Sequence, residues 1–412
     1  PAAAGYNLAL NGGCTITNSV TFLNTGTLTI GDATADTSTF NGGLTATAPS
    51  SVTIAGAIAT SDDAVSLGDA GTPVAVTAST TTSISTGTQT ITIGGALTIG
   101  SGSTLTLTNT NTVTLSSTVN GASAGVGTLE VNSTGVVSVS GIVGGTATLL
   151  GLTITNSGGT TFSLAVSATT VTLTATTGTI TFSGALVATT LSPAAAGYNL
   201  ALNGGCTITN AVAFANTGTL ALGNDAADTL LFNGGLTALS PSGVTLNGQI
   251  QTSGDAIIIG DSDTPVTLAG TTSILNTTNA TPAGASITVD GAVNGTADNT
   301  QSLTLNAGTD GAIAFGSTIG ATASKQPATL TVTNSNGAVF TGAVTTDTSV
   351  VLTDTTDAAN ITFTGALVTP TLTTAAQAYD LDLFGSGTII TNAVTFANTG
   401  TLALGNDAAD TL

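Results

Sequence analysis

Short runs in which apolar residues alternate with threonine or serine recur along the whole chain. Ser103-Thr-Leu-Thr-Leu-Thr108, Thr170-Val-Thr-Leu-Thr174 and Thr179-Ile-Thr-Phe182 are typical. A period of two places the apolar side chains on one face of a β-strand, and Thr, Val and Ile favour strands. Asn-Gly, Thr-Gly or Gly-Gly turns bound the runs, and no segment has the spacing of a helix of three turns. The pattern therefore predicts a chain of short strands joined by turns.

A second pattern sets the spacing of these strands. The motif apolar, any residue, Gly, any residue, apolar, or a degenerate form of it, closes many of the runs. Its first residues lie at positions 93, 115, 139, 162 and 182, and again at 289, 315, 340 and 363. The steps of about 20 to 26 residues are typical of solenoid repeats. The step from Phe40 to Ile54 breaks this period.

Each repeat is predicted to form one coil of two or three strands. A single coil cannot bury its own apolar face, so successive coils have to stack about 4.8 Å apart. Residues at equivalent positions of successive coils then stack on one another, as predicted for Phe340 and Phe363. A string of β-sandwich domains is the alternative, but it would not need this period. We therefore predict an all-β fold, a parallel β-helix or β-solenoid with coils of about 20–26 residues.

A longer repeat contains the shorter one. The segment Pro1–Asn18 returns unchanged at Pro193–Asn210, and a third copy starts near Ala375. Near-identity over such lengths indicates duplicated modules in a tandem array. The chain ends inside the third copy, so we expect it to be a segment of a longer polypeptide. The predicted modules are residues 1–192, 193–374 and 375–412.

Charge limits the partners that this chain can have. It carries 21 acidic residues, one Lys, no Arg and no His, a formal net charge of −20. Nucleic acids and anionic lipid surfaces attract proteins through Lys and Arg, so neither is an expected partner. Thr, Ser, Asn and Gly interrupt every apolar run, so no segment is long enough for a membrane-spanning helix.

Acidic turns are the most prominent polar feature. Ca²⁺ takes six to eight oxygen ligands, largely carboxylates and loop carbonyls, and a divalent cation would also reduce charge repulsion. Asp and Asn favour turns for backbone reasons alone, and no EF-hand loop is present. Structural turns and Ca²⁺ binding therefore both remain open. The candidate metal ligands are the repeated pairs Asp32 and Asp36, Asp225 and Asp228, and Asp407 and Asp410, with Asp261 and Asp263 from a second set of turns.

The remaining candidate chemistry is sparse. Without His, no Ser or Thr has the usual activating base, and paired carboxylates occur in any acidic turn, so we do not expect an enzyme. Cys14 and Cys206 are interpreted as small core residues or as sites of bonds between neighbouring molecules. Tyr6, Tyr198 and Tyr379 occupy equivalent repeat positions, where they either pack in the core or form shallow glycan-binding surfaces.

Motifs of the type Thr-Phe-Ser-Gly-Ala-Leu, at residues 181–186, lie in a Thr-, Gly- and Asn-rich array. This array resembles bacterial autotransporter passengers, filamentous-haemagglutinin-like adhesins and long β-strand-repeat surface proteins. The resemblance implies a right-handed parallel β-helix, an extracellular location at the cell surface and a role in adhesion, coating or fibre building. The chain departs from that group in its near-total loss of Lys.

Together these patterns predict a non-enzymatic structural protein. We expect a repeat segment of a long β-solenoid that forms a surface fibre, a coat or an adhesin stalk. Self-association is expected because the open strand edges of a solenoid invite pairing. The alternative function is a glycan- or surface-binding adhesin module.

Overall fold

The structure is a computed structural model that describes residues 2–408, 410 and 411. These residues form 46 strands, and none of them lies in a helix. The part of the chain described here thus contains no helix that could cross a membrane. The strands wind into a parallel β-solenoid of about 17 turns of ~23 residues, which confirms the predicted fold class.

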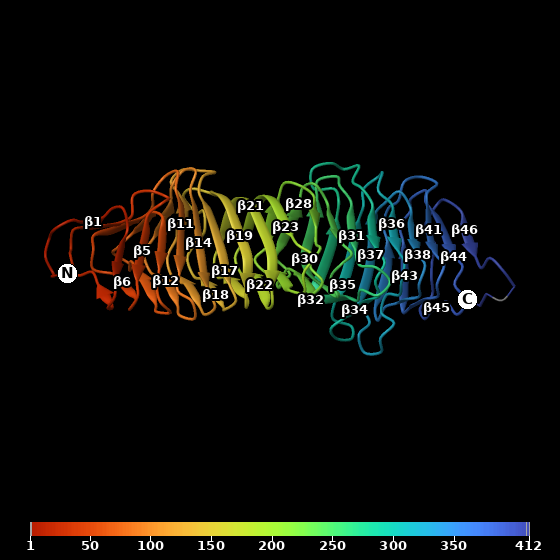
Figure 1. The fold of residues 1–412 in the computed structure, drawn as a ribbon. Coiled ribbons are helices and arrows are strands. Elements are labelled where there is room, and N and C mark those ends of the chain that lie inside the picture. Colours follow the sequence, from red (N-terminus) through yellow and green to blue (C-terminus); the bar gives the residue numbers. More distant parts are fainter. Residues whose placement is uncertain (1, 409, 412) are drawn as a thin grey trace. The chain divides into compact units, whose positions relative to one another are not determined.

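Three strands make up one coil, as two consecutive coils near the N-terminus illustrate. The first contains β4 (Thr27–Ile30), β5 (Thr37–Phe40) and β6 (Leu44–Ala46). The next contains β7 (Ser51–Ile54), β8 (Ala57–Ala59) and β9 (Val65–Leu67), and each strand pairs in parallel with its counterpart one coil earlier. Figure 1 shows strands of successive coils stacked side by side within each unit. Parallel pairing between successive coils excludes the β-sandwich alternative.

The ladder predicted from the glycine motif is present in the structure. In the first unit the Cα partners run from Ile93 to Leu115, Val139, Phe162 and Phe182. These residues close β12 (Ile91–Ile93), β15 (Val113–Leu115), β18 (Val137–Val139), β20 (Thr160–Phe162) and β22 (Thr179–Phe182).

The second unit continues the motif with aromatic residues. Val289, Phe315, Phe340 and Phe363 are Cα partners in β33 (Ile287–Val289), β36 (Ile313–Phe315), β38 (Ala338–Phe340) and β41 (Asn360–Phe363). The rings of Phe340 and Phe363 stack 4.8 Å apart at 13°. The predicted stacking of like on like is confirmed here.

The break between Phe40 and Ile54 has a simple structural reason. Phe40 in β5 pairs with Ile16 in β2 (Cys14–Ile16), whereas Ile54 in β7 pairs with Ile30 in β4. The two residues belong to different ladders, because the glycine motif occurs on more than one face of the coil. The period within each ladder is intact.

Apolar side chains of every coil point inward and form one stacked core in each unit. In β14 (Thr104–Asn109), Leu105 and Leu107 are fully buried, while the threonines between them are partly exposed. Burying one such side chain contributes roughly 1.5–3 kcal/mol, so stacked coils stabilise one another. The chain divides into two compact units, one ending at Leu200 and one beginning at Ala201. The predicted module boundaries lie elsewhere and stay a prediction.

Candidate functional site

The acidic turn after β4 is closed by one carboxylate. Asp36 Oδ2 accepts hydrogen bonds from the backbone N–H groups of Asp32 and Ala33, both at 2.8 Å. These two amides hold the pKa of Asp36 below its ordinary value. Gly31 starts the turn at φ 70°, and a Cβ there would lie 2.2 Å from the Ala55 carbonyl oxygen, so only Gly fits.

The same turn geometry recurs in the other copies. Asp228 Oδ2 accepts the N–H groups of Asn224 at 2.8 Å and Asp225 at 2.9 Å. Asp410 Oδ2 likewise accepts from two backbone N–H groups, three and four residues before it. The first turn position is Asp in one copy and Asn in two, but the accepting residue is Asp in all three. The need to close the turn therefore explains why an Asp recurs at this position, and no ligand is required to explain it.

The second set of acidic turns also uses its carboxylates locally. Asp261 Oδ1 accepts from the Thr264 hydroxyl at 2.9 Å and the Asp263 N–H at 3.0 Å. These bonds, the Thr264 hydroxyl first, lower the pKa of Asp261. In the first unit, Asp69 Oδ1 accepts the Gly71 N–H at 2.8 Å in the equivalent turn. Asp263 itself is exposed.

These turns do not assemble a cage of protein ligands. Across residues 2–408, 410 and 411, no group of three or more His, Cys, Asp or Glu side chains could hold a metal ion. A Ca²⁺ ion at one turn would therefore have one or two carboxylates and would need carbonyl and water oxygens for the rest. Ca²⁺ binding at these positions stays a prediction.

The burial of the three tyrosines distinguishes core packing from a glycan-binding surface. Tyr198 and Tyr379 have no exposed surface, whereas Tyr6, in the first coil, is 38% exposed. Burial raises the pKa of Tyr198 to about 12. Core packing is confirmed for Tyr198 and Tyr379, and a glycan surface centred on these two residues is excluded.

The two cysteines are free. Cys206 is 5% exposed, and burial raises the pKa of its thiol well above the ordinary value. Cys14, at the equivalent repeat position, is partly exposed. A buried thiol with a raised pKa is unreactive, so Cys206 is a small core residue, as predicted.

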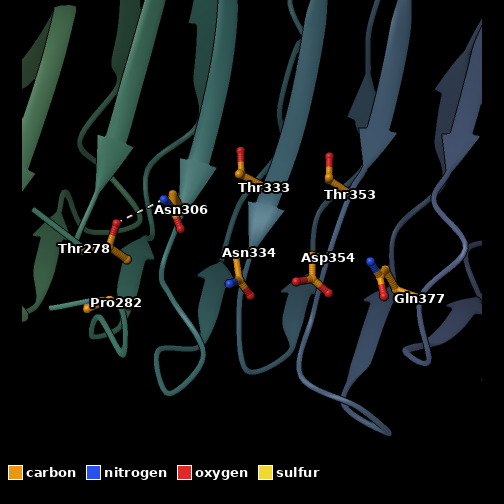
Figure 2. Close-up of a pocket in the computed structure, with 8 residues that line it drawn as sticks. All are labelled: Thr278, Pro282, Asn306, Thr333, Asn334, Thr353, Asp354 and Gln377. Atoms are coloured by element: carbon orange, nitrogen blue, oxygen red, sulfur yellow. Dashed lines mark hydrogen bonds between the residues drawn. The ribbon is translucent and has the colours of Figure 1, made fainter.

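A polar groove in the second unit was not predicted from the sequence. Its volume is about 410 Å³, and it lies where successive strands of one sheet end. Figure 2 shows its side chains in a row along the stack of strands, with one or two of them from each successive strand end. We call this feature the corner groove, and its lining residues are Thr278, Pro282, Asn306, Thr333, Asn334, Thr353, Asp354 and Gln377.

The register of the strands explains this row. Asn306 closes β35 (Ser302–Asn306) and is the Cα partner of Asn334, which closes β37 (Thr329–Asn334). Asp354 follows β40 (Ser349–Leu352), and Gln377 follows β43 (Thr371–Thr374). Each chain segment turns away from the sheet at the same corner, so amide and carboxyl groups recur once per coil.

Some of the side chains that line the groove form hydrogen bonds within the protein, and others form none. Thr278 accepts a hydrogen bond from Asn306 Nδ2 at 3.1 Å and donates to Asn276 Oδ1 at 2.7 Å. Among the described residues, the side chains of Thr333, Asn334, Thr353 and Gln377 make no hydrogen bond.

Two sequence signals point to this groove when the modules are compared. Residues 277–286 connect β32 (Val266–Asn276) to β33, whereas the shorter segment 86–90 connects the equivalent strands β11 (Thr81–Ser85) and β12. This extended segment supplies Thr278 and Pro282. The strand-terminal Asn residues are the second signal, but the same residue type also closes ordinary corners.

Comparisons with protein-family models, with curated proteins and with solved structures find no match to this chain. Its function is therefore inferred from the fold and the side chains alone.

Proposed function

We propose that this chain is a non-enzymatic structural segment of a longer extracellular β-solenoid that self-associates into a cell-surface fibre or coat, or forms an adhesin stalk. The observation that carries this proposal is the regular stacking of coils within each unit. Each coil covers the apolar face of the next, and the hydrogen-bond ladders run from coil to coil. A stack of this kind is extended by repetition, so length is gained without a new core design.

Composition supports an exposed, long-lived material. Lys325 is the one basic residue and there is no Met or Trp, so trypsin-like proteases and oxidants find few targets. Charged residues are 5% of the chain, and the outward strand positions carry mostly Thr and Ser, which favours lateral packing over solvation. The resemblance to bacterial surface repeat proteins agrees with this interpretation.

Negative-stain electron microscopy of the full chain, with oriented X-ray fibre diffraction, tests the proposal. We expect filaments or sheets at high protein concentration, with a reflection at about 4.8 Å from the coil spacing. Particles that stay single at every concentration, both in Ca²⁺ and in chelator, would refute self-association. Compact particles without that reflection would contradict the solenoid as well.

A further inference from the structure

We propose that the corner groove binds a neutral, linear polysaccharide. This inference goes beyond the proposed structural function and does not depend on it. It rests on the position of the groove, on its unpaired polar groups and on the charge of the chain.

The groove is long in one direction. Its polar side chains come from five consecutive positions along the coil stack, from Thr278 after β32 to Gln377 after β43. With about 4.8 Å between coils, this row is roughly 19 Å long. A ladder of equivalent groups at a fixed spacing fits a chain of repeating units better than a compact metabolite.

The corner is built differently in the two units. β14 and β37 have nearly the same sequence, Thr-Leu-Thr-Leu-Thr-Asn and Thr-Leu-Thr-Val-Thr-Asn. Asn109, at the end of β14, donates from Nδ2 to the carbonyl oxygens of Gln89 and Thr112 at 2.9 and 3.0 Å. The side-chain Oδ1 is buried and unpaired in both residues, but Asn334 Nδ2, at the end of β37, has no partner in the described chain. The second unit therefore leaves without a partner an amide N–H2 group that the first unit uses internally.

The groups that the groove offers to a ligand include both hydrogen-bond donors and acceptors along its length. Figure 2 shows the Thr333 and Thr353 hydroxyls pointing in the same direction from adjacent strands, with Asn334 and Asp354 beneath them. One oxygen of Asp354 accepts the Thr355 N–H at 2.9 Å, which leaves the other for a ligand. A ligand that matches this row must donate and accept at each step, which is what sugar hydroxyls do.

Charge excludes the acidic polysaccharides. The groove contains one carboxylate and no basic side chain, and the chain carries a net charge of −20. A polyanion would be repelled at every approach, whereas a neutral chain is not. The groove also presents no aromatic ring for stacking, so affinity has to come from hydrogen bonds and is expected to be weak for one groove.

Affinity gel electrophoresis of the full chain tests the proposal, because the high negative charge gives the protein good mobility. The probes are xylan, a mixed-linkage β-glucan and dextran, with polygalacturonate as the polyanion. We expect at least one neutral polysaccharide to retard the protein and polygalacturonate to leave it unaffected. If none of the three neutral probes retards it, the proposal is overturned.

A matched pair of variants then locates the binding. Thr353→Val with Gln377→Leu removes two exposed groove partners and should weaken binding about tenfold. Thr207→Val with Gln89→Leu changes the same residue types at exposed positions outside the groove and should leave binding unchanged. Unchanged urea midpoints establish that both variants fold. Equal retardation of the two variants would place binding elsewhere and overturn the groove assignment.

Discussion

In each acidic turn of the first set, one aspartate closes the turn by accepting backbone hydrogen bonds. This structural role explains the carboxylate without a bound ligand. Asp36 accepts two backbone N–H groups, and its pKa is lowered as a result. A depressed folded-state pKa means that the carboxylate stabilises the fold fully above its ordinary pKa of 3.8. That stabilisation is lost as the pH falls through the lower folded value.

Asp36→Asn should therefore lower the urea midpoint of unfolding at pH 7, because a neutral acceptor replaces a charge-assisted one. The difference from the wild type should shrink as the pH falls below 3.8 and vanish below the lowered folded-state pKa, where Asp36 is neutral in the folded chain as well. Urea titrations at a series of pH values measure this difference.

Asp63→Asn is the control for that experiment, since it removes the same charge from a carboxylate that makes no hydrogen bond within the described residues. A matched control is needed because other carboxylates also change stability with pH, and Asp347 does so with the opposite sign from Asp36. Burial and the neighbouring Asp298 raise the pKa of Asp347, so its ionisation costs stability as the pH rises. An equal loss of stability in both Asn variants would show that charge alone, not turn closure, sets the effect of Asp36.

Individual strands of the solenoid are too short to be stable alone, so stacked side chains carry the stability of each element. β38 is three residues long, yet it places Phe340 between the rings of Phe315 and Phe363, at 5.5 and 4.8 Å. On the same strand Val339 points outward and is 44% exposed. One strand thus offers a core position and a surface position side by side.

Phe340→Ala should destabilise the second unit by about 3–5 kcal/mol, because it removes a fully buried ring from the middle of a stack. Val339→Ala should cost less than about 1 kcal/mol. Urea unfolding measures both changes, and hydrogen exchange should show the effect of Phe340→Ala concentrated in β36, β38 and β41. A uniform rise in exchange along the chain would contradict the local coupling expected of a solenoid.

Prediction from sequence succeeded where side chains repeat and failed where they do not. The glycine motif predicted the ladder through Phe340 and Phe363, because stacking forces equal residues into register. It could not show that Phe40 and Ile54 lie on different faces, since the same motif marks both ladders. The corner groove was missed for a related reason. Asn334 and Asn109 are alike in sequence, and only the extended segment 277–286 signals a different corner.

At the scale of the whole molecule, negative charge without counter-charge is the dominant electrostatic feature. Twenty-one acidic residues face one Lys. Repulsion among them opposes the compact state and is screened by salt, with a Debye length of about 10 Å at 0.1 M. Folding and lateral association should therefore both improve with ionic strength.

Divalent cations should do more than screen if the acidic turns bind them. We expect Ca²⁺ to raise the urea midpoint above that measured in NaCl of the same ionic strength, because chelation by turn oxygens adds to screening. The excess should fall in Asp261→Asn with Asp263→Asn, which removes both carboxylates of one turn. Mg²⁺ should give a smaller excess than Ca²⁺, since it gives up its water reluctantly and demands near-ideal octahedral geometry. Coincident midpoints in CaCl₂ and NaCl at matched ionic strength would show that the turns bind no Ca²⁺ and that screening accounts for the whole effect.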